Sequence, residues 1–176
     1  PHHMHGRFTL EGFGRHVPER VLTNAELETM VDTSDDWITT RTGIKERHIA
    51  APGEASSDLA VRACSNALAD AGRTAEEVTH IYYATFTPDS FCPPASSILQ
   101  EKLGISGRPA VDMNAACSGF LYALEAGMGA VALRPGSVAL VTASEITTSR
   151  TNWADRATCV LFGDGAGAVV LDGGEG

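Results

Sequence analysis

The sequence contains 176 residues, of which 43% are hydrophobic, and its 13 Lys and Arg against 22 Asp and Glu give a formal net charge of −9. This hydrophobic content is typical of a folded chain and excludes a mainly disordered one, and the length suits one domain or part of a larger one. The negative charge argues against a nucleic-acid-binding protein, which would need a basic surface.

The first six residues are not expected to belong to the folded domain. Residues 1–6 (PHHMHG) resemble the remnant of a purification tag, so their histidines are left out of any metal argument and the domain is expected to span residues 7–176. The four cysteines form no CxxC pair, which argues against a zinc ribbon, and their scatter favours a reducing, cytoplasmic compartment.

The first part of the chain predicts one strand and three helices. Arg7–Gly14 alternates and ends on a glycine, which favours a short strand and a turn. Asn24–Val31 and Ser34–Thr42 each open with a capping residue, Thr33 or Ser34 for the second, and acidic residues in the first turn. Asp58–Ala71 has apolar residues at helical spacing and a glycine directly after it.

Strands and helices alternate through the middle of the chain. His80–Phe86 and Ala110–Ala115 predict strands, and Ala95–Leu103 and Ser118–Leu133 predict helices. Between the first strand and the first helix, Thr87–Pro94 contains three prolines and is expected to be an irregular loop. The alternation indicates an α/β fold with a mostly parallel sheet covered by helices.

The last part predicts three strands: Ser137–Ala143, Thr158–Phe162 and Ala166–Leu171. The glycine-rich run Gly163–Gly167 lies between the last two. A phosphate-binding fingerprint would need a helix after it, whereas AVVL follows, so a tight hairpin between antiparallel strands is expected.

Cys117 is the strongest candidate for chemistry. It falls between the strand ending at Ala115 and the helix starting at Ser118, where unpaired amides and the helix dipole would favour a thiolate and could hold an oxyanion. The alternative is a buried structural cysteine, which is the expected state of Cys64 and Cys159.

Trp37 and Arg41 form the second candidate site. They lie four residues apart on one helix and therefore on one face, where an indole and a guanidinium could stack a heterocycle and pair a phosphate, as in coenzyme A. An intrahelical cation–π contact without a ligand is the alternative. Arg156 could add a second cation.

Metal and membrane functions are not expected. His16, His48 and His80 show no ligand spacing. Ala115–Leu133 approaches the length of a membrane span, but Glu125 and three glycines make a buried helix the expected structure.

Three long segments resemble the β-ketoacyl-acyl-carrier-protein synthase III family, over about Phe8–Leu171. They are NAELETMVDTSDDWITTRTGIKERHIA (Asn24–Ala50), DMNAACSGFLYAL (Asp112–Leu124) and DRATCVLFGDGAGAVVL (Asp155–Leu171). The resemblance implies the N-terminal half of a thiolase-like fold and a homodimer. It implies an acyltransferase that condenses an acyl-CoA starter with malonyl-acyl carrier protein to initiate fatty acid synthesis, with no metal or redox cofactor.

The resemblance also implies the roles of particular residues. Cys117 would be the acyl-accepting nucleophile, and its amide would contribute to the oxyanion hole. Trp37 and Arg156 would sandwich the adenine of coenzyme A, with Arg41 and Thr33 contacting the same nucleotide.

Two departures from the family pattern matter. The family's His and Asn belong to a C-terminal half that is absent from this chain, so that half is a further expected partner. Where the family often has Phe in the acyl-pocket loop, this chain has Cys92 beside Phe91, which predicts tolerance of bulkier starters. The alternatives are a starter synthase or acyltransferase of a polyketide or secondary-metabolite pathway and a noncatalytic α/β module.

Overall fold

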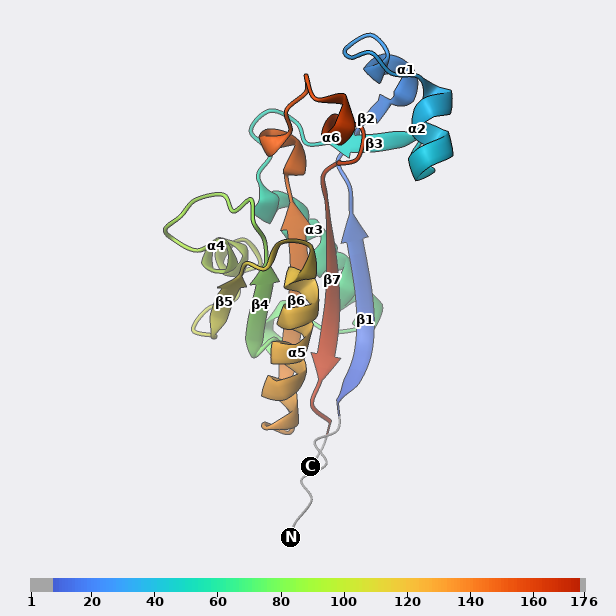
Figure 1. Cartoon of the computed structure of the whole chain (residues 1–176). Helices are drawn as coiled ribbons and strands as arrows, with labels where there is room; N and C mark the ends of the chain where they lie inside the picture. Colours follow the sequence, from blue (N-terminus) through green and yellow to red (C-terminus); the bar gives the residue numbers. More distant parts are fainter. Residues whose placement is uncertain (1–7, 175–176) are drawn as a thin grey trace. The chain divides into compact units, whose positions relative to one another are not determined.

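A five-stranded sheet organises the larger of two units in the computed structural model, which describes residues 8–174. The strands are, in spatial order, β1 (Thr9–His16), β7 (Gly165–Asp172), β6 (Val138–Glu145), β4 (His80–Ala84) and β5 (Ala110–Met113). Strand β4 pairs in parallel with both β5 and β6, whereas β1 pairs antiparallel with β7 (Figure 1). The expected parallel sheet is therefore present, with an antiparallel pair added along one edge.

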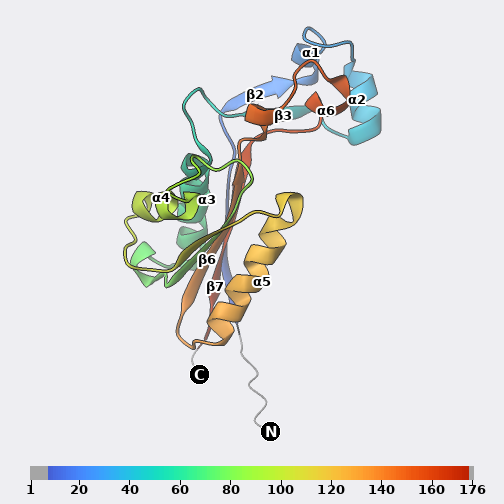
Figure 2. The same ribbon diagram turned by 60° about the vertical axis from the view of Figure 1, so that its left-hand side comes forward.

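Helices cover both faces of this sheet (Figure 2). Helices α3 (Ser56–Ala71) and α4 (Ala95–Lys102) pack on one face, and α5 (Gly119–Ala132) packs on the other. The central strands β4 and β6 therefore bury side chains on both faces, which explains why they read as continuous apolar runs rather than as alternating patterns. A 3₁₀ turn, η1 (Ala75–Glu77), follows α3 in the chain.

Gly12 and Gly14 let strand β1 approach helix α3. A Cβ built on Gly14 would lie 2.0 Å from the carbonyl oxygen of Ala63, and one on Gly12 would lie 2.3 Å from that of Ala67. The sequence predicted a turn from these glycines. They lie inside the strand instead, because their function is to admit the helix backbone.

The second unit contains residues 17–54 and 146–165. Strands β2 (Arg20–Thr23) and β3 (Glu46–Ile49) form an antiparallel pair. The short helices α1 (Asn24–Leu27), α2 (Asp35–Thr42) and α6 (Arg156–Cys159) and the 3₁₀ turn η3 (Thr147–Arg150) complete the unit. Its core gathers apolar residues from β2, α1, α2, β3 and the 159–160 segment: Leu22, Leu27, Ile38, Ile49, Cys159 and Val160.

The prediction of a strand over Thr158–Phe162 is wrong. Its first two residues close helix α6, because the Asp155 carboxylate caps that helix by accepting from the Ala157 N–H at 3.0 Å and the Thr158 hydroxyl at 2.7 Å. The glycine hairpin expected after it is absent too. Asp164 accepts instead from the amide of Ala50, which fastens the segment beside the end of β3.

The other differences concern element boundaries and one pair of strands that was not predicted. Helix α1 ends at Leu27 rather than Val31, and its N-cap is Thr23, whose hydroxyl accepts from the Glu26 N–H at 3.2 Å. Helix α2 is capped by Ser34, one of the two expected residues. The β2–β3 pair was not predicted, because each strand has only four residues. The tag expected at residues 1–6 lies outside the described residues.

Candidate active site

Cys117 lies where the sequence predicts it, at the turn between strand β5 and helix α5. The turn is the 3₁₀ helix η2 (Ala116–Ser118), closed by a hydrogen bond from the Ser118 N–H to the Ala115 carbonyl at 3.1 Å. Gly119 then starts α5, and a Cβ at that position would lie 3.2 Å from the Cβ of Ala84 on β4. The small residue therefore lets the start of the helix sit against the sheet.

The residue before the nucleophile candidate has an unusual backbone. Ala116 has φ of +47°, the one non-glycine residue with positive φ in the part of the chain that the structure describes. This left-handed conformation costs an L-residue of order 1 kcal/mol and is found at functional turns. A sharp strand-to-helix turn that presents a nucleophile is the arrangement of the nucleophile elbow.

The cysteines divide as the sequence predicts. Cys117 and Cys92 are exposed, whereas Cys64 and Cys159 are buried. Burial raises the pKa of Cys64 to about 12, so its thiol stays protonated at neutral pH. Cys117 is thus the exposed thiol at a strand-to-helix turn, which excludes the alternative of a buried structural cysteine at this position.

In the second unit, Trp37 lies under two guanidinium groups. The Arg41 Cζ lies 4.5 Å from the centroid of the indole ring, and the Arg156 Cζ lies 5.0 Å from it. We call these three residues the Trp37 cluster. Arg41 reaches the ring from the next turn of α2, as the spacing predicts, so the intrahelical cation–π contact exists. Arg156 comes from α6, and sequence spacing alone does not place it there.

Local contacts hold the members of the Trp37 cluster. The Ser34 hydroxyl accepts from the Trp37 N–H at 3.1 Å, which fixes the first turn of α2. The Arg156 Nη1 donates to the Asp32 carbonyl at 3.0 Å. About half of the Arg156 side chain is exposed.

Thr33, the fourth predicted contact of coenzyme A, precedes this cap. Its Oγ1 is buried and has no hydrogen-bond partner within residues 8–174. A buried hydroxyl without a partner is costly.

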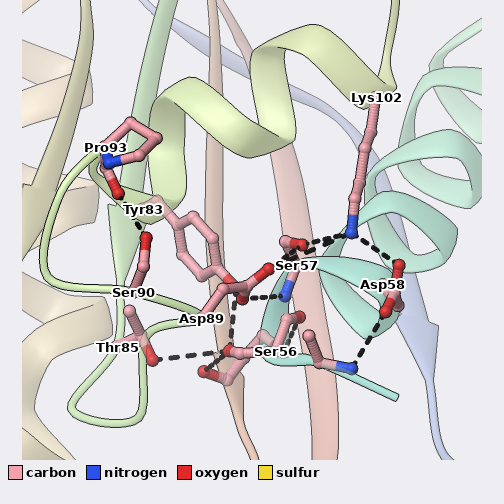
Figure 3. Close-up of polar contacts among 11 residues, drawn as sticks. Ser56, Ser57, Asp58, Tyr83, Thr85, Asp89, Ser90, Pro93 and Lys102 are labelled. Carbon is pink, nitrogen blue, oxygen red and sulfur yellow. Dashed lines mark hydrogen bonds and ion pairs between the residues drawn. The ribbon is translucent and has the colours of Figure 1, made fainter. Parts of the chain in front are cut away.

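The predicted acyl-pocket residues Phe91 and Cys92 lie on the loop between β4 and α4. Both are exposed, and the Phe91 side chain is fully so. Contacts within the larger unit fasten the loop on the tip's N-terminal side (Figure 3). The Asp89 carboxylate accepts from the Ser57 N–H at 2.9 Å and from the Ser57 hydroxyl at 2.5 Å.

Lys102 completes this fastening (Figure 3). Its Nζ donates to the Ser57 hydroxyl and to the Asp58 carboxylate, both at 2.6 Å, and lies 3.9 Å from Asp89. The Ser90 hydroxyl donates to the Pro93 carbonyl at 2.8 Å, which closes the tip around Phe91 and Cys92. The loop is therefore irregular in backbone but fixed by hydrogen bonds to the rest of the larger unit, which is typical of loops that present functional side chains.

Glu145 anchors the start of the same loop. Its carboxylate accepts from the Phe86 N–H at 2.9 Å, the Thr85 hydroxyl at 3.1 Å and the Thr87 N–H at 3.1 Å. Burial raises the pKa of Glu145, because the ionised form loses water there. Sequence analysis did not single out Asp89, Lys102 or Glu145, since their partners come from distant elements.

The Trp37 cluster belongs to the smaller unit, and Cys117, Phe91 and Cys92 belong to the larger one. The smaller unit also has a pocket of about 460 Å³ whose lining includes Leu22, Ile49 and Trp153. None of the predicted site residues lines it.

Two kinds of feature are absent from residues 8–174. Within the described residues, His, Cys, Asp and Glu side chains form no group of three or more that could hold a metal ion. The same part of the chain has no helix whose length and apolar character would let it cross a membrane, and the expected core helix α5 has 14 residues.

Comparison with known proteins identifies relatives over nearly the whole chain. The family model for 3-oxoacyl-[acyl-carrier-protein] synthase III matches residues 111–176. A β-ketoacyl-[acyl-carrier-protein] synthase III of Oleidesulfovibrio alaskensis is 59% identical over 160 residues, which cover 91% of this chain and 48% of the relative. The chain thus spans about half the length of the curated relatives that it matches.

Solved structures agree. The crystal structure of 3-oxoacyl-[acyl-carrier-protein] synthase III from Aquifex aeolicus matches with a TM-score of 0.91 and 44% identity over 94% of this chain and 54% of that one. The priming β-ketosynthase of the R1128 polyketide pathway matches with a TM-score of 0.90 and 38% identity over 94% of this chain and 49% of that one. The chain has a thiolase-like fold and belongs to the β-ketoacyl-[acyl-carrier-protein] synthase III family.

Proposed function

We propose that the protein is an acyltransferase that forms an acyl-enzyme on Cys117 and initiates fatty acid synthesis. The observation that carries this proposal is the exposed thiol at the strained turn between β5 and α5. The family membership supports the reaction type, in which an acyl-CoA is the first substrate and malonyl-acyl carrier protein the second.

In the first half-reaction, the Cys117 thiolate attacks the thioester carbonyl. A new carbon–sulfur bond forms, the amides at the start of α5 would stabilise the negative oxygen, and the bond to coenzyme A breaks. Coenzyme A leaves as a thiolate and takes up a proton. The enzyme retains the acyl group as a thioester.

In the second half-reaction, malonyl-acyl carrier protein loses carbon dioxide. The electron pair of the broken carbon–carbon bond forms a carbanion, which attacks the acyl carbonyl on Cys117. The thiolate of Cys117 is released, and β-ketoacyl-acyl carrier protein is the product. The resemblance assigns the His and Asn that support this step to a second half of the family sequence.

The Trp37 cluster is proposed to bind the nucleotide of coenzyme A. The indole offers a stacking surface, and two guanidinium groups supply positive charge in a chain whose net charge is −9. Local cations must attract the anionic substrates, because the overall field opposes them. Thr33 is proposed to contact the same nucleotide.

A cytoplasmic homodimer is part of the same proposal. Strand β5 lies at the edge of the sheet, and Val111 on it is exposed. An open edge with an apolar side chain favours pairing with a second copy.

The decisive experiment is intact-mass analysis after incubation with acetyl-CoA, in a protein of full family length that carries this sequence. We expect one acetyl group, located on Cys117 by peptide mapping and absent in Cys117→Ser. Cys92→Ser is the matched control, because it removes the other exposed thiol and should acylate normally. A folded wild-type protein without an adduct would support the noncatalytic module instead.

A second candidate is a starter synthase or acyltransferase of a polyketide or secondary-metabolite pathway. Cys92 favours it, because this thiol occupies the loop position where the family often has Phe and leaves room for a larger acyl group. Acceptor assays separate the two candidates. Condensation with malonyl-acyl carrier protein supports fatty acid initiation, and transfer to a different acceptor supports the second candidate.

A further inference from the structure

Arg47 is a buried arginine without a carboxylate partner. It lies on β3 with 4% of its surface exposed, and among residues 8–174 it forms no ion pair. Its Nη2 donates to the Val160 carbonyl at 2.7 Å, and its Nη1 donates to the Asn24 side-chain oxygen at 2.8 Å. Its Nε has no partner in that part of the chain.

Burying the charged Arg47 guanidinium costs free energy. Burial lowers the pKa of Arg47, which reflects the cost of removing its charge from water. Hydrogen bonds to neutral oxygens offset only part of that cost, and an apolar side chain of similar length would avoid it. The arrangement therefore calls for a function other than stability.

Asn24 forms the other half of this buried pair. Its Nδ2 donates to the Asp35 carboxylate at 2.7 Å and to the Ile44 carbonyl at 2.8 Å, while its Oδ1 accepts from Arg47. Asp35 is the first residue of α2 and also accepts from the Thr39 hydroxyl at 3.3 Å. Asn24 thus ties both ends of the α2 segment to β3.

The Asn24–Arg47 pair links the two helices that carry the Trp37 cluster. Asp35 stands two residues before Trp37 on α2, and Val160 is the C-cap of α6, which begins with Arg156. The connected side chains run from Asp35 through Asn24 and Arg47 to Val160. A Cβ at Gly163 would lie 3.0 Å from the Cβ of Arg47, so the following segment closes tightly over the pair.

We propose that Arg47 and Asn24 are positioning residues that fix the backbones carrying Trp37 and Arg156 at the spacing needed to hold a nucleotide between ring and guanidinium. The inference rests on the proposed binding of coenzyme A at the Trp37 cluster. To admit the base, the half-exposed Arg156 guanidinium must leave the Trp37 ring and its hydrogen bond to the Asp32 carbonyl, while the backbone of α6 stays in place. Ligand binding then costs little ordering, which is the advantage of a preorganised site.

The test compares two thioesters in a protein of full family length that carries this sequence. Acetyl-CoA carries the nucleotide, whereas acetyl-N-acetylcysteamine lacks it and cannot use the Trp37 cluster. Arg47→Met removes the forked hydrogen bonds but keeps length and apolar volume. We expect it to raise the acetyl-CoA concentration for half-maximal Cys117 acylation at least tenfold. The acylation rate with acetyl-N-acetylcysteamine should stay within twofold of wild type.

Matched variants isolate the positioning effect. Arg20→Met removes another arginine of the same unit, one in an exposed ion pair with Glu26, and should leave both thioesters unaffected. In a Trp37→Ala background, Arg47→Met should add little to the loss with acetyl-CoA, because the ring that it positions is gone. Arg47→Lys keeps a charge without the fork and should be intermediate. It also replaces Arg47→Met in the comparison if the latter does not fold.

The outcomes separate this inference from the proposed function. If Trp37→Ala leaves acetyl-CoA use unchanged, the Trp37 cluster does not bind the nucleotide and both ideas fail. If Trp37→Ala weakens acetyl-CoA use but the Arg47 variants do not, only the positioning role is overturned. Equal losses with both thioesters would show that Arg47 serves general stability alone.

Discussion

Replacing Gly14 with alanine should destabilise the larger unit strongly. The added Cβ would lie 2.0 Å from the carbonyl oxygen of Ala63 and 2.4 Å from the backbone nitrogen of Ala67. Both are backbone atoms of α3, so no side-chain rotation can relieve the overlap. Strand and helix would have to separate by more than about 1 Å, which we equate with an overpacking cost of about 3 kcal/mol.

Urea unfolding followed by circular dichroism would measure this loss. For a chain of this length, about 3 kcal/mol also corresponds to a fall in Tm of roughly 6–12 °C. Gly129→Ala is the matched control. Gly129 lies within α5 on its exposed side, and no atom lies within 4 Å of a Cβ added there. It should stabilise the protein by about 0.5–1 kcal/mol. The packing argument fails if Gly14→Ala unfolds within 0.5 kcal/mol of wild type, an order-of-magnitude threshold for ordinary surface changes.

Three further outcomes are expected. Burial and the nearby Arg134 charge lower the pKa of His80, so the folded state binds a proton less well than the unfolded state. The stability contributed by neutral His80 should be full above about pH 6.5 and should be lost as the pH falls through the lowered pKa. His80→Gln should flatten this dependence, which urea titrations at pH 7.5 and 5 would measure. Iodoacetamide should label the exposed Cys92 and Cys117 in the native protein and should label the buried Cys64 and Cys159 only after urea is added. Peptide mapping would check this. Cys92→Phe should lower acylation by hexanoyl-CoA more than acylation by acetyl-CoA, because the larger side chain would leave less room for a long acyl group. A wild-type protein that accepts only acetyl-CoA would contradict the predicted tolerance of bulkier starters.

Local sequence patterns were sufficient for several elements that position the site. Helix α3 ends at Ala71 with Gly72 in the left-handed conformation, as the pattern predicts, because a C-cap is decided by the residues within one turn. The position of Cys117 between β5 and α5 was equally readable, since a strand, a turn and a helix follow one another in the chain. The long family motifs then supplied the expected roles of the residues.

Other features depended on segments far apart in the chain. Thr158–Phe162 has the composition of a strand but lies partly in α6, because the Asp155 cap and burial in the smaller unit's core outweigh its β-propensity. Gly12 and Gly14 looked like turn residues, because their close contacts belong to a helix about fifty positions later.

The candidate site shows the same division. The sequence by itself determined that Trp37 and Arg41 share a helical face and that Cys117 precedes a helix, because fixed spacings along one element dictate both. Only the tertiary structure brought Arg156 over the Trp37 ring and joined Arg47 to Val160, 113 positions along the chain. Those contacts arise from the packing of separate elements around a shared core, and no local pattern records which distant backbone will supply the partner.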